Sequence, residues 1–283
     1  VYTGTSPHGQ GHETAWAMLA SDETGIPMDK ITLIWGDTDL VPTGGGTMGS
    51  RSLQQGGAAV HQGAIELVEK AKQLAAQLLE ADEADIVLDK DNAAFHVAGT
   101  PAVSKSWAEL AVASRQQGDE LTIDTLFVAD MATFPFGAHI AVVEVDTETG
   151  SVEMVRHIAV DDCGKILNPL LVTGQQHGGI AQGAARALFE GVFYDDDGNP
   201  VTGNLMNYAI PAASELCSFE TSNTETPSPR NPLGAKGIGE SGTIGSTPAI
   251  HNAVLDAVSH LGVKHIDMPL TAMTVWNAIR AAG

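Results

Sequence analysis

The chain carries three glycine-rich loops, each placed where a helix is expected to begin: GQGHE at residues 9–13, GGGTMGSRS at residues 44–52 and GAKGIGESG at residues 234–242. Glycine lets a backbone approach a ligand closely and adopt dihedral angles that other residues avoid. Backbone amides at the start of a helix carry partial positive charge and bind anions. The three loops therefore predict a chain that surrounds a large, polar, anionic cofactor.

The length and composition predict an ordered globular protein of one or two domains. The chain has 283 residues, of which 43% are hydrophobic, and no apolar run is long enough to span a membrane. Its net charge of −21 disfavours nucleic acid and anionic membranes as partners and suits a cytoplasmic protein. Cys163 and Cys217 form neither a disulfide framework nor a CxxC motif, so we expect no structural zinc or iron–sulfur site within the chain.

Helical and strand patterns alternate along the sequence, which predicts an α+β fold of mixed sheets packed with long helices. Each half of the chain contains a glycine-rich loop, a long helix and a pair of strands. We therefore expect two similar subdomains, residues 1–120 and 121–283, with the irregular stretch 122–137 as their connection. The predicted helices are 10–24, 54–80, 107–115, 169–189, 248–261 and 271–282, and the predicted strands are 31–35, 85–88, 93–97, 138–145 and 152–160.

Two of the loops also match the dinucleotide-binding motif GxGxxG, at residues 44–49 and 237–242. That motif requires a strand directly before it and an acidic residue about twenty positions later at a strand end. In both places the region that follows is helical by pattern instead. A phosphate-bearing ligand in another geometry, or a simple tight turn, is the favoured interpretation.

Two groups of side chains in the loops are candidate site residues. Ser50, Arg51 and Ser52 combine hydroxyls with the amides of a helix start, which suits a phosphate or oxo group, although Ser52 could equally serve as the helix cap. Glu240 is a carboxylate among glycines and follows Lys236 by four residues. It could act as a general base, or it could simply be a carboxylate that favours the N-terminus of a helix.

Other polar residues admit a structural interpretation as readily as a functional one. His12 and Glu13 lack the second histidine of an HExxH metal site. Gln175 and the glutamines near it could read the polar edge of a heterocycle, or they could satisfy backbone groups between packed segments. The run DDDGN at residues 195–199 is expected to be a solvated turn rather than a calcium loop.

Taken together, six segments resemble the molybdenum hydroxylase family, which includes xanthine dehydrogenase, aldehyde oxidase and aerobic carbon monoxide dehydrogenase. The resemblance covers essentially the whole chain, in family order, and it corresponds to the C-terminal half of the large, molybdopterin-binding subunit. The matching segments are residues 9–14 (GQGHET), 36–39 (GDTD), 46–52 (GTMGSRS), 162–164 (DCG) with 168–169 (NP), 174–179 (GQQHGG) with 182–183 (QG), and 237–241 (GIGES).

The resemblance implies that the chain binds molybdenum–molybdopterin, with the cytosine dinucleotide form expected from bacterial relatives. It implies that Gln10 contacts the pterin, that residues 49–52 bind the pterin and its phosphate, and that Gln175 is a further cofactor contact. Glu240 falls at the position of the glutamate beside molybdenum, which acts as the base. The full set of cofactor-binding residues expected in this way is Gln10, Gly11, Thr47, Met48, Gly49, Ser50, Arg51, Ser52, Cys163, Gln175, Lys236, Gly237 and Gly239.

The resemblance also implies a larger enzyme, which oxidises an aldehyde, an N-heterocycle or CO with oxygen derived from water. Its electrons leave through iron–sulfur clusters and FAD on other chains or domains. The expected partners are therefore the N-terminal half of the large subunit, the iron–sulfur and FAD subunits and a small-molecule substrate. Because that N-terminal half is absent, we expect this fragment alone to be inactive, and the start at Val1 without an initiator Met suggests a cut N-terminus. The alternatives are a non-catalytic assembly module without bound cofactor and a nucleotide-dependent dehydrogenase.

Overall fold

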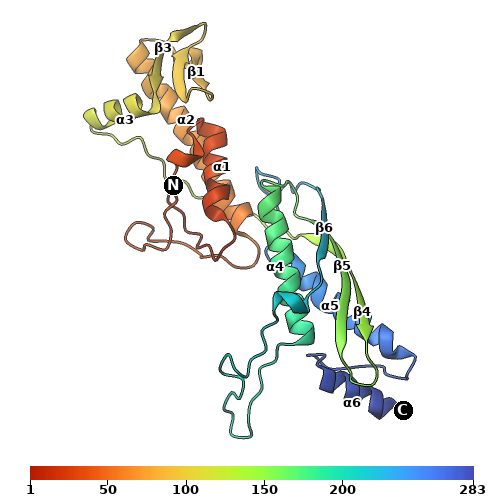
Figure 1. Ribbon diagram of the computed structural model, residues 1–283. Coiled ribbons are helices and arrows are strands. Elements are labelled where there is room, and N and C mark those ends of the chain that lie inside the picture. The colour runs from red at the N-terminus through yellow and green to blue at the C-terminus, as the bar shows by residue number, and fades with distance from the viewer. The chain divides into compact units, whose positions relative to one another are not determined.

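The computed structural model describes residues 1–283, which divide into two compact units (Figure 1). Unit 1 comprises Val1–Thr133 and Ser228–Ala235, and unit 2 comprises Phe134–Pro227 and Lys236–Gly283. The chain thus passes from unit 1 into unit 2 within the third glycine-rich loop. Each unit contains one three-stranded sheet together with helices, so the fold is α+β, as the alternating patterns predict.

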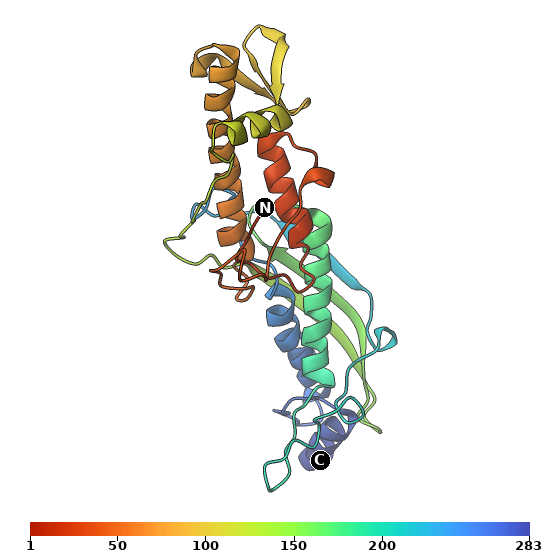
Figure 2. The same ribbon diagram turned by 90° about the vertical axis from the view of Figure 1, so that its left-hand side faces the viewer.

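Unit 1 is built along a long helix, α2 (Ala58–Leu79), which continues a π-helical turn at Leu53–Gly57. Helix α1 packs beside α2, and a small antiparallel sheet and helix α3 pack near its C-terminal part (Figure 2). Phe95 of the sheet and Leu110 of α3 are fully buried against Ala71 of α2 and form the centre of this core. The bounds are α1 His12–Thr24, β1 Ile86–Asp89, β2 Ala94–Val97, β3 Thr100–Ser106 and α3 Trp107–Gln116.

Unit 2 has a mixed sheet in the order β4–β5–β6, with β4 antiparallel and β6 parallel to the central strand. Helices α4 and α5 pack against each other and cover one face of this sheet (Figures 1 and 2). Ile250, Val254 and Val258 recur every four residues along α5 and are fully buried, which gives the helix one continuous apolar face. The bounds are β4 Phe136–Val145, β5 Val152–Asp162, α4 Pro169–Leu188, β6 Phe219–Thr224, α5 Ser241–Ser259 and α6 Ala272–Ala282.

Glycines let α4 and α5 approach closely. A Cβ atom on Gly242 of α5 would lie 2.7 Å from the carbonyl oxygen of Gln176 and 2.8 Å from the backbone nitrogen of Ile180, both in α4. Conversely, a Cβ on Gly179 would lie 3.0 Å from the Cα of Gly242. No side chain fits at this contact, so the glycines of the GQQHGG and GIGESG segments set the distance between the two helices.

Several predicted elements differ from the structure. The expected strand 31–35 is only an isolated bridge between Tyr2 and Ile34, because the N-terminal segment is its sole bonding partner. Strands β3 and β6 were not predicted, and the first sheet is antiparallel rather than mixed. Helix α5 begins at Ser241 and not near Pro248, which lies inside it. The structure places the first turn of this helix seven residues earlier than predicted.

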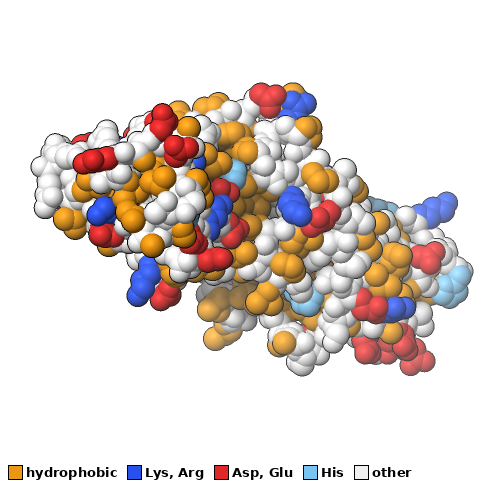
Figure 3. Space-filling view, turned by 90° about the horizontal axis from the view of Figure 1, so that it is seen from above, with side chains coloured by type: hydrophobic (Ala, Val, Ile, Leu, Met, Phe, Trp, Pro, Cys, Tyr) orange, Lys and Arg blue, Asp and Glu red, His pale blue; other side chains and the backbone are white.

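The chain is strongly acidic. The 35 acidic residues outnumber the 14 basic ones. On the face drawn in Figure 3, the acidic side chains are scattered among apolar and uncharged ones. None of the helices combines the length and the apolar character that a membrane crossing would require.

Candidate cofactor-binding site

The second glycine-rich loop lies directly beside the N-terminal segment of the chain, within unit 1. The backbone N–H of Gly46 donates to the carbonyl oxygen of Gly4 (3.1 Å), and the N–H of Ser6 donates to Oγ1 of Thr47 (3.1 Å). A Cβ atom on Gly44 would lie 2.5 Å from the carbonyl oxygen of Gly4. The N-terminal segment and the second loop, about forty residues apart in sequence, therefore form one surface. The first of them is followed by α1 and the second by the π-helical turn and α2.

The second loop turns sharply just before the π-helical turn that precedes α2. Gly46, Gly49 and Ser50 all have positive φ angles, of 65°, 64° and 52°. Such angles are uncommon for a residue with a side chain, so Ser50 marks a tight turn of a kind that is enriched at functional sites. The first amides of the following helix have no acceptor within that helix. The turn thus places backbone donors at a point where an anion could bind.

Side chains around this turn add further donors. The hydroxyl of Ser52 donates to Oγ1 of Thr47 (3.1 Å) and makes no capping bond, so the interpretation of Ser52 as a side-chain cap is wrong. The guanidinium of Arg51 lies against Gly45, where a Cβ would be 3.3 Å from its Nη2 atom. Met48 is exposed. A guanidinium, hydroxyls and helix-start amides within one short loop are a donor set that fits a phosphate group.

The first glycine-rich loop leads into α1. Gly11 occupies the position before the helix with φ 78°, and half-buried Gln10 accepts a hydrogen bond from the backbone N–H of His8 through Oε1. His12 is buried and stacks on Trp16, with 4.6 Å between the ring centroids. Gln10 and Gly11 therefore lie at the helix start that the sequence predicts, whereas His12 belongs to the packing of α1.

In unit 2, the third glycine-rich loop is attached to the end of strand β5. Nζ of Lys236 lies 3.0 Å from Oδ1 of the fully buried Asp162, and the backbone N–H of Lys236 donates to the carbonyl oxygen of Cys163 (2.7 Å). The ammonium group also lies over the ring of Phe136, 4.6 Å from its centroid. The structure therefore brings Lys236 and Cys163 together, and it gives the Lys236 charge a carboxylate partner on β5.

Asp162 is an ionised carboxylate in a buried position. Burial by itself raises the pKa of Asp162, but hydrogen bonds from the amide of Gly164, from Lys236 and from Thr226 and Thr224 outweigh it and hold the pKa well below its usual range. The neighbouring thiol behaves in the opposite way, because burial and the negative charge of Asp162 raise the pKa of Cys163 to about 11. Cys163 is therefore a neutral thiol near pH 7, and what it gives the third loop is its backbone carbonyl.

The adjacent carboxylate, Asp161, is also buried and joins three elements. Ser241 at the start of α5 donates its hydroxyl to Oδ1 (2.5 Å), and Gln176 of α4 donates Nε2 to Oδ2 (2.9 Å). His139 of β4 lies 3.4 Å from Oδ1 through Nε2. Burial by itself raises the pKa of Asp161, and these hydrogen bonds lower it below its ordinary value. The sequence did not single out Asp161 or Ser241 as candidate site residues.

His157 lies behind His139 and is fully buried. Its Nε2 is 3.3 Å from Nδ1 of His139, and its own Nδ1 has no hydrogen-bond partner. Burial, together with the proximity of His139, lowers the pKa of His157 from 6.5 to about 4, although Asp161 opposes this shift. The ring is therefore neutral in the folded protein near pH 7.

This low pKa predicts a specific acid sensitivity. Because the pKa of His157 is lower in the folded state than in the unfolded one, its contribution to stability is fully present above pH 6.5 and is lost as the pH falls towards 4. Between pH 7 and pH 4.5, the free energy of unfolding should fall by about 2 kcal/mol less in a His157→Phe variant than in the wild type. Urea titrations at both pH values measure this, with exposed His260→Phe as the control; equal pH dependence in all three proteins would refute it.

The remaining predicted residues of unit 2 lie along the third loop and on α4. Gly237 is buried and Gly239 exposed, and the exposed Glu240 directly precedes α5 without making a capping hydrogen bond to its amides. Gln175 of α4 is half-buried, whereas Gln176 beside it is the fully buried one and bonds to Asp161. For Gln176, the structure thus supports the interpretation of a buried amide that satisfies polar groups between packed segments.

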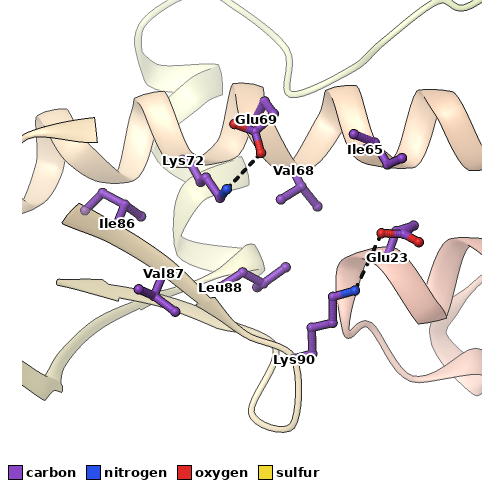
Figure 4. Close-up of a pocket in the computed structure, with 9 residues that line it drawn as sticks. All are labelled: Glu23, Ile65, Val68, Glu69, Lys72, Ile86, Val87, Leu88 and Lys90. Carbon is purple, nitrogen blue, oxygen red and sulfur yellow. Dashed lines mark hydrogen bonds and ion pairs between the residues drawn. The ribbon is translucent and has the colours of Figure 1, made fainter. Parts of the chain in front are cut away.

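A pocket of about 420 Å³ in unit 1 lies apart from all these loops. Figure 4 shows its lining: the end of α1, one side of α2 and strand β1. Its charged side chains pair within the pocket, Lys72 with Glu69 (2.8 Å) and Lys90 with Glu23 (3.5 Å). None of the residues predicted to bind the cofactor lines it, so this pocket gives no support to the predicted site.

The dinucleotide-binding interpretation lacks its structural context. No strand directly precedes residues 44–49, because the segment 31–35 forms only a bridge, and the chain before residues 237–242 is irregular back to the end of β6. Without a strand–loop–helix unit, the glycines cannot present a dinucleotide in the manner of that motif. The loops therefore require a ligand that is bound in another way.

Residues 1–217 match the protein family described as the molybdopterin cofactor-binding domain. The chain belongs to this molybdenum hydroxylase family. It is 40% identical over 282 residues to the carbon monoxide dehydrogenase large chain of Hydrogenophaga pseudoflava, which covers 98% of this chain and 35% of that relative. The family that six short segments indicated is thereby confirmed.

Solved structures of the family show the same fold over the whole chain. A crystal structure of Cu,Mo-CO dehydrogenase matches with a TM-score of 0.87 at 39% identity, covering 100% of this chain and 36% of that one. Quinoline 2-oxidoreductase from Pseudomonas putida 86 matches with a TM-score of 0.84 at 36% identity, again covering 100% of this chain and 36% of the other. The chain thus spans about a third of the length of the relatives that it matches.

Proposed function

We propose that this chain supplies cofactor contacts of the large subunit of a molybdenum hydroxylase, and that both predicted cofactor-binding segments, residues 1–120 and 121–283, contribute them. One observation carries the proposal: the positive-φ turn of Gly46, Gly49 and Ser50 at a helix start, in a chain of a molybdopterin-binding family. Such a turn presents amides to an anion, and the phosphate is the anionic part of the cofactor.

The individual contacts follow from where the loops place their donors. In unit 1, we assign the pterin contact to Gln10 and Gly11, and the phosphate contacts to residues 47–52. In unit 2, we assign contacts to Gln175 and to the backbone of residues 236–239 and Cys163. The side chain of Lys236 has another task, because its ammonium group is already paired with Asp162. We expect the cytosine dinucleotide form of the cofactor.

We assign the role of general base to Glu240. When bound, the molybdenum centre would supply a two-electron oxidation in which water provides the oxygen atom. A carboxylate that accepts the proton of that water accelerates such a step. Glu240 is exposed, and Gly237 and Gly239 before it have no side chains that could block access to its carboxylate. Its neighbour Ser241 is bonded to the buried carboxylate of Asp161. These features suit a base that must meet a ligand rather than fill a core.

The substrate class remains a choice among three. The relatives include a CO dehydrogenase and a quinoline oxidoreductase at nearly equal identity, 39% and 36%. We therefore propose CO, an N-heterocycle or an aldehyde as the substrate, with electrons leaving through iron–sulfur and FAD partners. The second candidate function is a non-catalytic assembly module. A module of that kind has no need of Gln10 or Glu240, and this chain retains both.

Turnover assays on the full-length protein test the proposed function. The protein is purified with its partner chains from a host that makes the cofactor, and it is then mixed with CO, a panel of aldehydes or a panel of N-heterocycles and an artificial electron acceptor. We expect turnover with one class only, and we expect that turnover to disappear in protein from cells grown without molybdate. Stoichiometric molybdenum without turnover on any class would favour the assembly module.

A further inference from the structure

The loop that carries Glu240 is attached to the protein at its start by Asp162. Lys236, which immediately precedes residues 237–240, is 10% exposed and pairs with Asp162, and the Asp162 carboxylate is itself fully buried. The backbone of Lys236 is tied to the same strand through the carbonyl oxygen of Cys163 (2.7 Å). Two independent bonds therefore fix the start of the loop to the C-terminal end of strand β5.

The same loop is attached at its end by the adjacent residue, Asp161. The hydroxyl of Ser241, the residue after Glu240, donates to Oδ1 of Asp161 (2.5 Å). Successive side chains of a strand point to opposite faces, so two neighbouring carboxylates can reach two different points of one loop. The four residues 237–240 thus lie between two anchors that sit side by side at the end of β5.

Asp161 is itself held from two other elements. Gln176 of α4, which is fully buried, donates Nε2 to Oδ2 of Asp161 (2.9 Å) and also lies 3.4 Å from the carbonyl oxygen of Ser222 in β6. His139 of β4 approaches Oδ1 at 3.4 Å. These contacts restrict the movement of the Asp161 carboxylate. The loop is therefore bonded through Ser241 to a group that is itself fixed in place.

We propose that Asp161 and Asp162 are positioning residues that clamp residues 237–240 at both ends and thereby orient the carboxylate of Glu240. Asp162 acts through Lys236, and Asp161 acts through Ser241. This inference rests on the proposed role of Glu240 as the base. A general base that is displaced by about 1 Å can lose a large part of its rate enhancement. A clamp that holds the carboxylate of Glu240 in place would therefore increase the reaction rate.

The serines of α5 offer a matched test of the clamp. Ser241→Ala removes the hydroxyl that reaches Asp161, while Ser246→Ala removes a buried hydroxyl of the same helix that has no hydrogen-bond partner. Hydrogen–deuterium exchange is measured on the full-length protein with its partners. We expect the amides of residues 237–242 to exchange roughly 10- to 100-fold faster in Ser241→Ala, because a bond to a charged acceptor is lost. Ser246→Ala should match the wild type.

The same variants are then compared in turnover. Ser241→Ala should lower kcat per bound molybdenum by about 10-fold or more, because the anchor next to Glu240 is lost while the anchor at Lys236 is kept. Ser246→Ala should leave this quantity unchanged. A purely structural role of Asp161 would instead reduce molybdenum content or protein yield and leave kcat per molybdenum unchanged.

The outcomes separate the clamp from the role of Glu240. Equal exchange of residues 237–242 in the two serine variants would overturn the clamp, whatever Glu240 does. Faster exchange in Ser241→Ala with a wild-type kcat, in a protein whose Glu240→Gln variant is inactive, would overturn the positioning role. Full turnover of Glu240→Gln would overturn the base and with it the positioning role, and the exchange data would distinguish that case from a failed clamp.

Discussion

Replacing Glu240 by Gln in the full-length enzyme is expected to lower kcat by about 100- to 10,000-fold while molybdenum content and folding stay intact. The amide keeps the size of the side chain but cannot accept the proton, and general-base catalysis contributes an effect of this size. Glu240 is exposed and makes no side-chain capping bond to α5, and glutamine keeps the length and shape of the side chain, so we expect the fold to tolerate the replacement.

A matched carboxylate elsewhere in unit 2 controls for the loss of one negative charge. Glu144 of β4 is exposed and lies opposite Glu153 of β5, so Glu144→Gln should leave kcat unchanged. The two variants are compared by steady-state turnover with molybdenum measured on the same samples. Wild-type turnover in Glu240→Gln would remove this residue from the role of base, and a loss of molybdenum would show that it holds the cofactor instead.

Gly242→Ala is expected to destabilise unit 2 by about 3 kcal/mol, at the upper end of what overpacking usually costs. The added Cβ would lie 2.7 Å from the carbonyl oxygen of Gln176 and 2.8 Å from the nitrogen of Ile180. Both are backbone atoms of α4, which cannot rotate away as a side chain can. The two helices would have to move apart, and the buried contacts between them would be lost.

An alanine on the open side of the same helix pair gives the opposite expectation. Gly178 of α4 has no atom within 4 Å of its Cβ position, so Gly178→Ala should stabilise the helix by up to about 1 kcal/mol. The shift of the urea midpoint of unfolding measures both changes. Equal midpoints for the two variants would mean that the glycines do not set the distance between α4 and α5.

Local sequence patterns were sufficient for the parts of the fold that depend on periodicity. The apolar spacing in residues 54–80 predicted α2, and the turn at residues 146–150 predicted the β4–β5 hairpin. Strand β6 was missed because apolar and polar residues alternate only weakly in its six residues, which pair in parallel with residues 62 positions earlier in β5. Pairing of this kind depends on the tertiary structure, and no local signal reports it.

The candidate site shows the same division. The glycine-rich loops could be predicted, because glycine content is a local property, and the start of α1 was predicted to within two residues, whereas the predicted start of α5 lies seven residues too late. The partner of Lys236 could not, since Asp162 lies 74 residues earlier in the chain. Likewise, two adjacent glutamines, Gln175 and Gln176, look alike in the sequence, and only the tertiary packing, in which Gln176 reaches β5 and β6, determines which of them is buried.

Molybdenum and pterin analysis tests the central claim most directly, on this chain purified alone and after co-expression with the preceding part of a large subunit of the same family. The account predicts close to one molybdenum and one pterin per chain in the co-expressed sample and far less in the chain alone. Absence of both from the co-expressed sample, in a host that makes the cofactor, would contradict a cofactor-binding role and leave the assembly module as the better description.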